Sequence, residues 1–178
     1  MRRIGQADRL LFLDESGVNL SMAREFAWAP SSERAVGFVP KNWGQSMTVA
    51  AALSPDGIIA PLLLEGAMNG PTFYAYIEQF LAPELRSGDL VIMDNLAAHK
   101  PLGIRALIQA RGARLLFLPP YSPDFSPIEL AWSKMKAVLR KVAARTREQL
   151  LPAVAKALHA ITANDARGWF GHCGYRVP

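Results

Sequence analysis

Two aspartates follow short apolar runs in the sequence. Asp14 comes directly after the run at 10–13, and Asp94 comes directly after the run at 90–93. Runs of this kind are typical of strands buried on both faces. If the two strands are parallel neighbours, both carboxylates emerge at one edge of the sheet, where ligands of open α/β sheets bind.

Two carboxylates at that edge would repel each other unless a cation lay between them. Oxygen ligands of this hard type favour Mg²⁺ or Mn²⁺ over zinc. The pair therefore predicts a divalent-metal site, although either aspartate alone is also typical of a turn after a strand. Neighbouring strand residues point to opposite faces, so Asp14 and Glu15 cannot both serve one site. We choose Asp14 because the buried run ends on it.

Glu129 is the third candidate, and its local sequence offers a competing explanation. Ser126, Pro127 and Glu129 match a helix capping box, with Ser126 as the N-cap and Glu129 reaching back to it. The same placement would aim Glu129 from the first helical turn toward the sheet edge, after the proline-rich segment at 119–123 has crossed it. Asp124, in the same loop, is an alternative third ligand.

The elements that must position these acids form an α/β pattern. Short apolar runs predict strands at 10–13, 26–28, 47–53, 58–64, 90–93 and 115–118. Apolar residues at helical spacing predict helices at 72–85, 101–111, 127–142 and 147–161. A turn signal at 54–57 makes two of the strands a hairpin. This order predicts one mixed sheet covered by helices, in a single α/β domain spanning residues 1–178.

Composition narrows the class of protein. The 178 residues are 51% hydrophobic and 20% charged, which is typical of one folded domain and excludes disordered, collagen-like and disulfide-rich classes. The single Cys173 cannot form an intramolecular disulfide, and with His172 it gives too few ligands for a zinc site. No apolar run is long enough to span a membrane, and no signal-peptide cleavage site is present. We therefore expect a cytoplasmic protein without a membrane partner.

The net charge of +5 is unevenly distributed. Residues after Glu129 carry a net +7, and the rest of the chain carries −2. Basic residues on the helix after Glu129 favour salt-sensitive phosphate contacts, with a solvated helix face as the alternative. The candidate DNA-binding residues are Lys134, Lys136, Arg140, Lys141 and Arg145, with Lys41 and Trp43 in an earlier loop. Trp43 could stack on a base or pack over the hairpin.

A resemblance to a known family is carried by three segments. They are residues 11–16 (LFLDES), residues 91–95 (VIMDN) with His99, and residues 118–129 (LPPYSPDFSPIE). The sequence resembles the catalytic domain of DDE transposases of the mariner-like superfamily, in the branch found in bacterial insertion sequences. Asp94 and Glu129 are separated by 34 residues, as in that branch, and residues 169–175 (WFGHCGY) are also similar to family members.

The resemblance implies an RNase H-like fold with Asp14, Asp94 and Glu129 as catalytic residues and metal ligands. It implies two Mg²⁺ or Mn²⁺ ions in each active site, which serve cleavage and strand transfer of double-stranded DNA at element ends. Asn95 and His99 would hydrogen-bond a ligand carboxylate or a DNA phosphate, although His99 is equally consistent with a structural role at a helix start.

The resemblance also has implications for partners. Transposases of this kind usually act as homodimers. A complete transposase needs helix-turn-helix modules ahead of its catalytic core, and here the first acid is already at position 14. We therefore expect that the helix-turn-helix region is absent from this chain and is supplied by a separately encoded subunit. The protein would be associated with the nucleoid.

Two other functions remain open from the sequence. One is an RNase H- or resolvase-type nuclease without strand transfer, against which the proline-rich segment and the 34-residue spacing argue. The other is an inactive regulatory fragment that binds DNA or a full-length partner, which the presence of all three acids disfavours. Metal-dependent nicking of DNA would distinguish either enzyme from the inactive fragment. Joining of a 3′ end to target DNA would distinguish a transposase from a nuclease without strand transfer.

Overall fold

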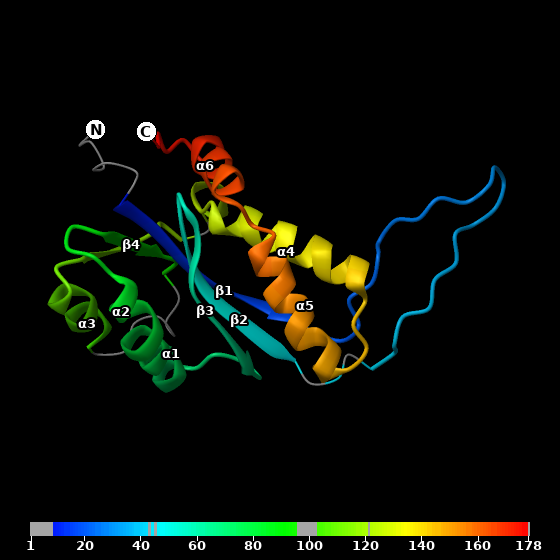
Figure 1. Cartoon of the computed structure of the whole chain (residues 1–178), viewed down its shortest axis with the longest axis horizontal. Helices are drawn as coiled ribbons and strands as arrows, with labels where there is room; N and C mark the ends of the chain where they lie inside the picture. Colours follow the sequence, from blue (N-terminus) through cyan, green and yellow to red (C-terminus); the bar gives the residue numbers. More distant parts are fainter. Residues whose placement is uncertain (1–8, 43, 45, 96–102, 121, 178) are drawn as a thin grey trace.

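A five-stranded sheet with helices on both faces forms the protein (Figure 1). The computed structural model describes residues 9–42, 44, 46–95, 103–120 and 122–177. The strands are β1 (Leu10–Val18), β2 (Met47–Ser54), β3 (Gly57–Glu65), β4 (Leu90–Met93) and β5 (Arg114–Phe117). Their spatial order is β3-β2-β1-β4-β5, antiparallel from β3 to β1 and parallel from β1 to β5. The predicted mixed sheet is confirmed.

Two helical layers cover the sheet. On one face lie α4 (Ile128–Val142), α5 (Arg147–His159) and α6 (Ala163–His172). On the other lie α1 (Gly70–Tyr76), its continuations η2 (Ile77–Leu81) and α2 (Ala82–Glu84), and α3 (Ile104–Ala110). A short 3-10 turn, η4 (Pro123–Phe125), precedes α4. Leu10 and Phe12 pack with α4, whereas Leu11 and Leu13 pack with α1 and α3, as the two-residue period of a strand requires.

Strand β1 does not end at Asp14, where the apolar run predicts its end, but continues to Val18. Its parallel pairing with β4 stops at Leu13 and Met93, whereas its antiparallel pairing with β2 continues to Val18 and Met47. Because β2 supplies backbone partners beyond Asp14, the chain stays extended. Asp14 therefore lies inside a strand, at the position where the parallel half of the sheet ends.

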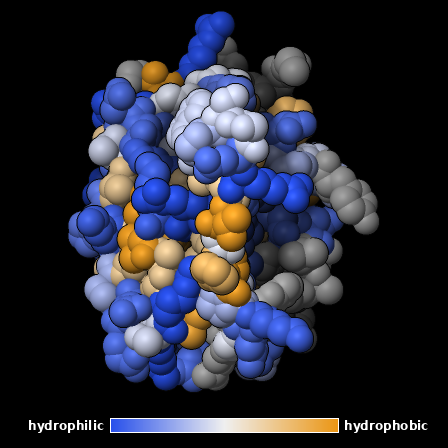
Figure 2. Space-filling view, turned by 90° about the vertical axis from the view of Figure 1, so that its right-hand side faces the viewer, coloured by the Kyte–Doolittle hydropathy of each residue, from blue (hydrophilic) through white to orange (hydrophobic). Residues whose placement is uncertain are grey.

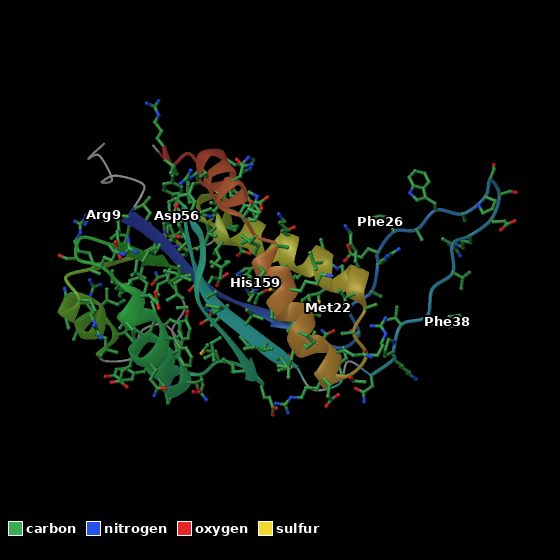
Figure 3. All side chains as sticks on the ribbon, viewed as in Figure 1. Arg9, Met22, Phe26, Phe38, Asp56 and His159 are labelled. Carbon is green, nitrogen blue, oxygen red and sulfur yellow. The ribbon has the colours of Figure 1, made fainter. Side chains whose placement is uncertain are left out.

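The predicted strand at 26–28 is wrong. These residues have no regular secondary structure, and the segment 23–42 projects away from the sheet and helices (Figures 1 and 3). A strand needs a neighbour for its backbone hydrogen bonds, and the pairing of the described sheet does not include this segment. Phe26 and Trp28 are consequently exposed to solvent and not packed in a core.

The helix predicted at 72–85 forms, but it contains a π-helical turn. Pro83 has no N–H and its ring crowds the preceding turn, which disturbs the regular ladder. The N–H of Ala82 accordingly bonds to the carbonyl of Ile77, five residues earlier. The wider turn places Phe80, predicted on the apolar face, where it is 39% exposed and stacks on Tyr76 with ring centroids 6.1 Å apart.

The C-terminal helices include one that the sequence analysis missed. The predicted helices at 127–142 and 147–161 correspond to α4 and α5, and α6 follows them. A capping box starts α6: the Thr162 hydroxyl accepts from the Asp165 N–H, and the Asp165 carboxylate accepts from the Thr162 N–H. That pattern is visible in the sequence and could have located the helix. No helix within the described ranges is long and apolar enough to cross a lipid bilayer.

Candidate active site

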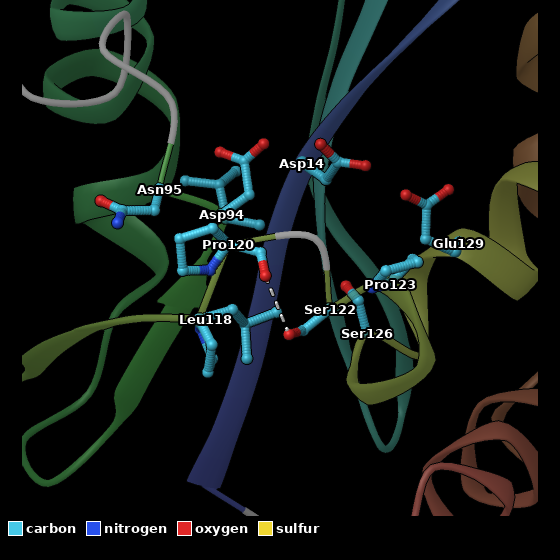
Figure 4. Close-up of a pocket in the computed structure, with 11 residues that line it drawn as sticks. Asp14, Asp94, Asn95, Leu118, Pro120, Ser122, Pro123, Ser126 and Glu129 are labelled. Atoms are coloured by element: carbon cyan, nitrogen blue, oxygen red, sulfur yellow. Dashed lines mark hydrogen bonds between the residues drawn. The ribbon is translucent and has the colours of Figure 1, made fainter.

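A cavity of about 360 Å³ opens at the carboxyl end of β4, against the first turn of α4. Asp14 reaches it from β1, Asp94 from the residue after β4, and Glu129 from α4 (Figure 4). Figure 4 shows Asp14 between the other two acids, with all three carboxylates pointing to the same side. The structure therefore brings together three acids that lie up to 115 positions apart in the sequence.

Strand register places the two aspartates side by side. Leu13 pairs with Met93 in the parallel ladder, so Asp14 and Asp94 are the next residues on neighbouring chains. Two residues earlier, Phe12 and its partner on β4 pack in the core beneath α4. The period of a strand turns Asp14 to that same face, toward α4. Glu15 follows on the opposite face and does not line the cavity.

Glu129 points into the cavity because the predicted capping box does not form. The N-cap of α4 is Pro127, and no side chain caps this end of the helix. The backbone of Ser126 instead closes the η4 turn by donating to the Pro123 carbonyl, and its own carbonyl accepts from the Glu129 N–H. With no bond back to the cap, the Glu129 carboxylate faces Asp14 (Figure 4).

The carboxylate of Asp14 is held in an unusual electrostatic environment. Burial raises its pKa to about 7, against hydrogen bonds from the Glu15 N–H and the Trp132 indole that lower it. The negative charges of Glu129 and Glu15 raise the pKa further. The indole Nε1 of Trp132 donates to Asp14 Oδ2 over 2.9 Å. The sequence predicts Trp132 only as a core residue, so this contact was missed.

The donor set suits a hard divalent cation. Carboxylate oxygens are the ligands that Mg²⁺ and Mn²⁺ prefer. Burial, and to a smaller extent the neighbouring acids, disfavour the ionised form of Asp14, and a bound cation would stabilise that form. Within the described part of the chain, no group of three or more His, Cys, Asp or Glu side chains is arranged to hold one metal ion.

Four other predicted residues have different placements. Asn95 lines the cavity beside Asp94. Asp124, the alternative third ligand, lies in η4 and does not line it. The predictions for His99 and Trp43 fall outside the described residues.

Two of the basic residues predicted to contact DNA form ion pairs within the protein. Lys134 pairs with Asp165, whose pKa falls to about 2 because this ammonium and the Thr162 donors stabilise its charge. Arg140 pairs with Glu25, at 2.8 Å, where the 23–42 segment leaves the domain. These contacts tie α4 to α6 and to the root of that segment.

The remaining basic candidates differ in exposure. Arg145 donates to two backbone carbonyls just before the 23–42 segment, both at 2.9 Å, and so helps to anchor it. Lys41 and Lys141 are exposed, and Lys136 is half-buried. Lys134 and Arg140 of α4 are therefore internal anchors, as is Arg145 beyond its end, whereas Lys141 is exposed at the end of this helix.

The family follows from a comparison with known proteins. Residues 9–151 match the model of the DDE superfamily endonucleases. This chain belongs to the DDE superfamily endonucleases. A comparison with curated protein sequences gives no match.

Solved structures of the Mos1 transposase share the fold of this DDE endonuclease. A pre-cleavage Mos1 transpososome matches with a TM-score of 0.76 and 14% identity, over 97% of this chain and 55% of that one. The Mos1 mariner paired end complex with Mn matches with a TM-score of 0.70 and 16% identity, over 97% of this chain and 54% of that one. The Mos1 mariner catalytic domain matches with a TM-score of 0.67 and 14% identity, over 97% of this chain and 80% of that one. The chain spans about half of the longer Mos1 chains, and its predicted RNase H-like fold is confirmed.

The raised pKa of Asp14 predicts how stability depends on pH. Between about pH 4 and 7 the native state holds a proton on Asp14 that the unfolded state has released, so this group lowers the free energy of unfolding as pH rises. Asp14→Asn should abolish that loss and be more stable than wild type at pH 8, by up to about 4 kcal/mol, and equal to it near pH 4. Urea unfolding in EDTA measures both proteins. An equal stability difference at the two pH values would contradict the assignment.

Proposed function

We propose that this chain is the catalytic domain of a transposase, which cleaves DNA at the ends of an insertion sequence and joins the freed 3′ ends to target DNA. The observation that carries the proposal is the single cavity shared by Asp14, Asp94 and Glu129 in a DDE superfamily endonuclease. Three carboxylates on an RNase H-like sheet edge are a donor set for metal-assisted phosphoryl transfer.

The three acids would hold two Mg²⁺ or Mn²⁺ ions. Asp14 lies between Asp94 and Glu129, and the three carboxylates point to the same side, so together they would hold the ions (Figure 4). When bound, the ions supply activation of a water or 3′-hydroxyl nucleophile and stabilisation of the leaving 3′-oxygen. Mos1 paired end complexes with Mn and with Mg support divalent metals for this fold.

Other residues of the cavity would orient the substrate and limit access of water. Leu118 and Pro119 form an apolar wall beside the acids, and a low local dielectric strengthens the attraction between carboxylates and cations. The Asn95 amide also lines the cavity and can donate to a phosphate or a ligand carboxylate. His99 is proposed for the same task from the sequence alone.

The basic face of α4 would track the DNA backbone beside the cavity, with Lys41 as a further contact. Lys134, Arg140 and Arg145 would first have to give up the partners they have within the protein. Lys136 and Lys141 have no ion pair with any described residue, so they are the primary contacts in this proposal. Phosphate contacts of this kind position the duplex and do not read its sequence.

Sequence recognition and location complete the proposal. Because phosphate contacts carry no sequence information, the element ends would be recognised by a helix-turn-helix part supplied by a separately encoded subunit. Double-stranded DNA, as element end and as target, is the substrate. The protein would act in the cytoplasm, associated with the nucleoid.

A homodimer is supported by the segment 23–42. Phe26 is 89% exposed and Phe38 is 94% exposed, with Trp28 and Val36 also in solvent. Figure 2 looks onto this side of the molecule and shows apolar side chains near the middle of a mostly polar face. Phe26 and Phe38 lie on the two limbs of the projecting segment (Figure 3), and large apolar groups exposed on such a segment are typical of an interaction site. We assign that site to a second copy of this chain, because the transposases that the sequence resembles usually act as homodimers.

Removal of one catalytic carboxylate tests the enzymatic proposal. Asp94→Asn should slow Mg²⁺-dependent nicking of plasmid DNA on the order of 10²–10³-fold, because one ion loses a charged ligand. Asp124→Asn removes the same charge outside the cavity and should nick at the wild-type rate. Joining of a pre-cut 3′ end to plasmid is measured with the same proteins. Nicking without joining would indicate a simple nuclease, and normal nicking by Asp94→Asn would refute the assigned site.

Charge removal on α4 tests the DNA path. A protein with Lys136→Gln and Lys141→Gln should bind duplex DNA with a salt slope smaller by about 2, since each phosphate contact contributes roughly 0.9 to the slope. Arg111→Gln, at the end of α3 on the opposite face of the sheet, is the matched control and should keep the wild-type slope. The slope comes from titrations at several salt concentrations. Equal slopes for all three proteins would exclude this path.

Loss of apolar side chains tests the dimer. Phe26→Ser together with Phe38→Ser should weaken self-association at least about ten-fold, because two exposed rings lose the surface that association buries. Leu151→Ser changes a partly exposed residue of α5 and should leave the association constant unchanged. Sedimentation velocity over a concentration series measures all three proteins. A wild-type monomer at every concentration would contradict the proposal.

A further inference from the structure

Trp132 makes a polar contact that a core residue does not need. Its side chain is 2% exposed and packs among apolar residues between α4 and the sheet. The indole has one polar atom, Nε1, which can only donate. That atom donates to Asp14 Oδ2 over 2.9 Å, across 118 positions of sequence. A phenylalanine or leucine would bury apolar surface here without requiring an acceptor.

The contact joins the two elements that carry neighbouring acids. Glu129 and Trp132 are three residues apart on α4, so they lie on the same side of the helix. Glu129 reaches the cavity from this side of the helix, and Trp132 donates its hydrogen bond to Asp14 of β1. Apolar side chains of α4 and β1 also pack together, but such packing has no preferred direction. The hydrogen bond is a directional link between Asp14 and the Glu129 helix.

We propose that Trp132 is a positioning residue, whose indole N–H fixes the orientation of the Asp14 carboxylate and its distance from Glu129 for metal binding. The inference rests on the proposed function, because it assigns Trp132 a role toward the ions of that site. The hydrogen bond holds Asp14 Oδ2 toward α4, so the carboxylate cannot rotate freely when it binds an ion. Loss of a donor that hydrogen-bonds a metal-ligating side chain commonly weakens metal affinity ten- to hundred-fold.

Metal affinity gives the direct test. Trp132→Phe keeps an aromatic ring but lacks the N–H, and it should bind Mn²⁺ at least about ten-fold more weakly in calorimetry. Its nicking activity should return toward the wild-type rate at high metal concentration, so that the metal requirement changes more than the maximal rate. Trp169→Phe alters the partly buried tryptophan of α6 and should bind Mn²⁺ as wild type does.

A second substitution separates the N–H from the packing. Replacement of Trp132 by β-(3-benzothienyl)alanine keeps the bicyclic shape and exchanges the N–H for sulfur, so it should fold even if Trp132→Phe does not. It should show the same weakened Mn²⁺ binding. In ¹⁵N-labelled wild type, the Trp132 indole signal should shift on Mg²⁺ addition while the Trp169 signal stays in place.

Two negative results have different meanings. Equal Mn²⁺ affinities for wild type and the benzothienyl protein would overturn the positioning role while leaving the metal site intact. A wild-type protein that binds no Mn²⁺ would overturn the proposed function, and with it this inference.

Discussion

Burial of the Asp14 carboxylate between β1 and α4 costs free energy, because charge is removed from water and placed near Glu129 and Glu15. The structure offsets part of this cost with the Trp132 and Glu15 donors, and protonation would offset the rest. A divalent cation would do the same while keeping the carboxylate ionised. The rest of the site is arranged around that requirement, with two more acids on the same cavity and no described lysine or arginine lining it.

Two kinds of strand pairing meet at Asp14. The parallel ladder with β4 brings Asp94 alongside, and the antiparallel ladder with β2 continues past Asp14 to Val18 and Met47, which keeps the backbone extended. Helix α4 then crosses this point with Glu129 in its first turn and Trp132 one turn later. A sheet fixes the position of a residue more precisely than a loop does, and two of the three acids are placed by one register.

The sequence predicted the elements well where local signals and tertiary contacts agree. The buried runs, the hairpin and helix α4 are of this kind. The predicted strand at 26–28 is wrong, because these apolar residues lie on a projecting segment. The predicted cap at Ser126 does not form, because the Ser126 N–H that it needs is used by a 3-10 turn. The extension of β1 and the bond from Trp132 depend on partners distant in sequence, which no local pattern contains. The expected ends of two neighbouring strands paired Asp14 with Asp94, and the family resemblance joined Glu129 to them.

Asp14, Asp94 and Glu129 are proposed to hold divalent metal together, and metal-directed cleavage of the polypeptide tests this directly. Fe²⁺ can replace Mg²⁺ at oxygen sites, and with ascorbate and peroxide it produces hydroxyl radicals that cut the polypeptide nearby. Cuts are expected close to positions 14, 94 and 129, and they should be suppressed by excess Mg²⁺ and greatly reduced in Asp14→Asn. Cuts at other positions, or cuts at these three that Mg²⁺ does not suppress, would contradict it.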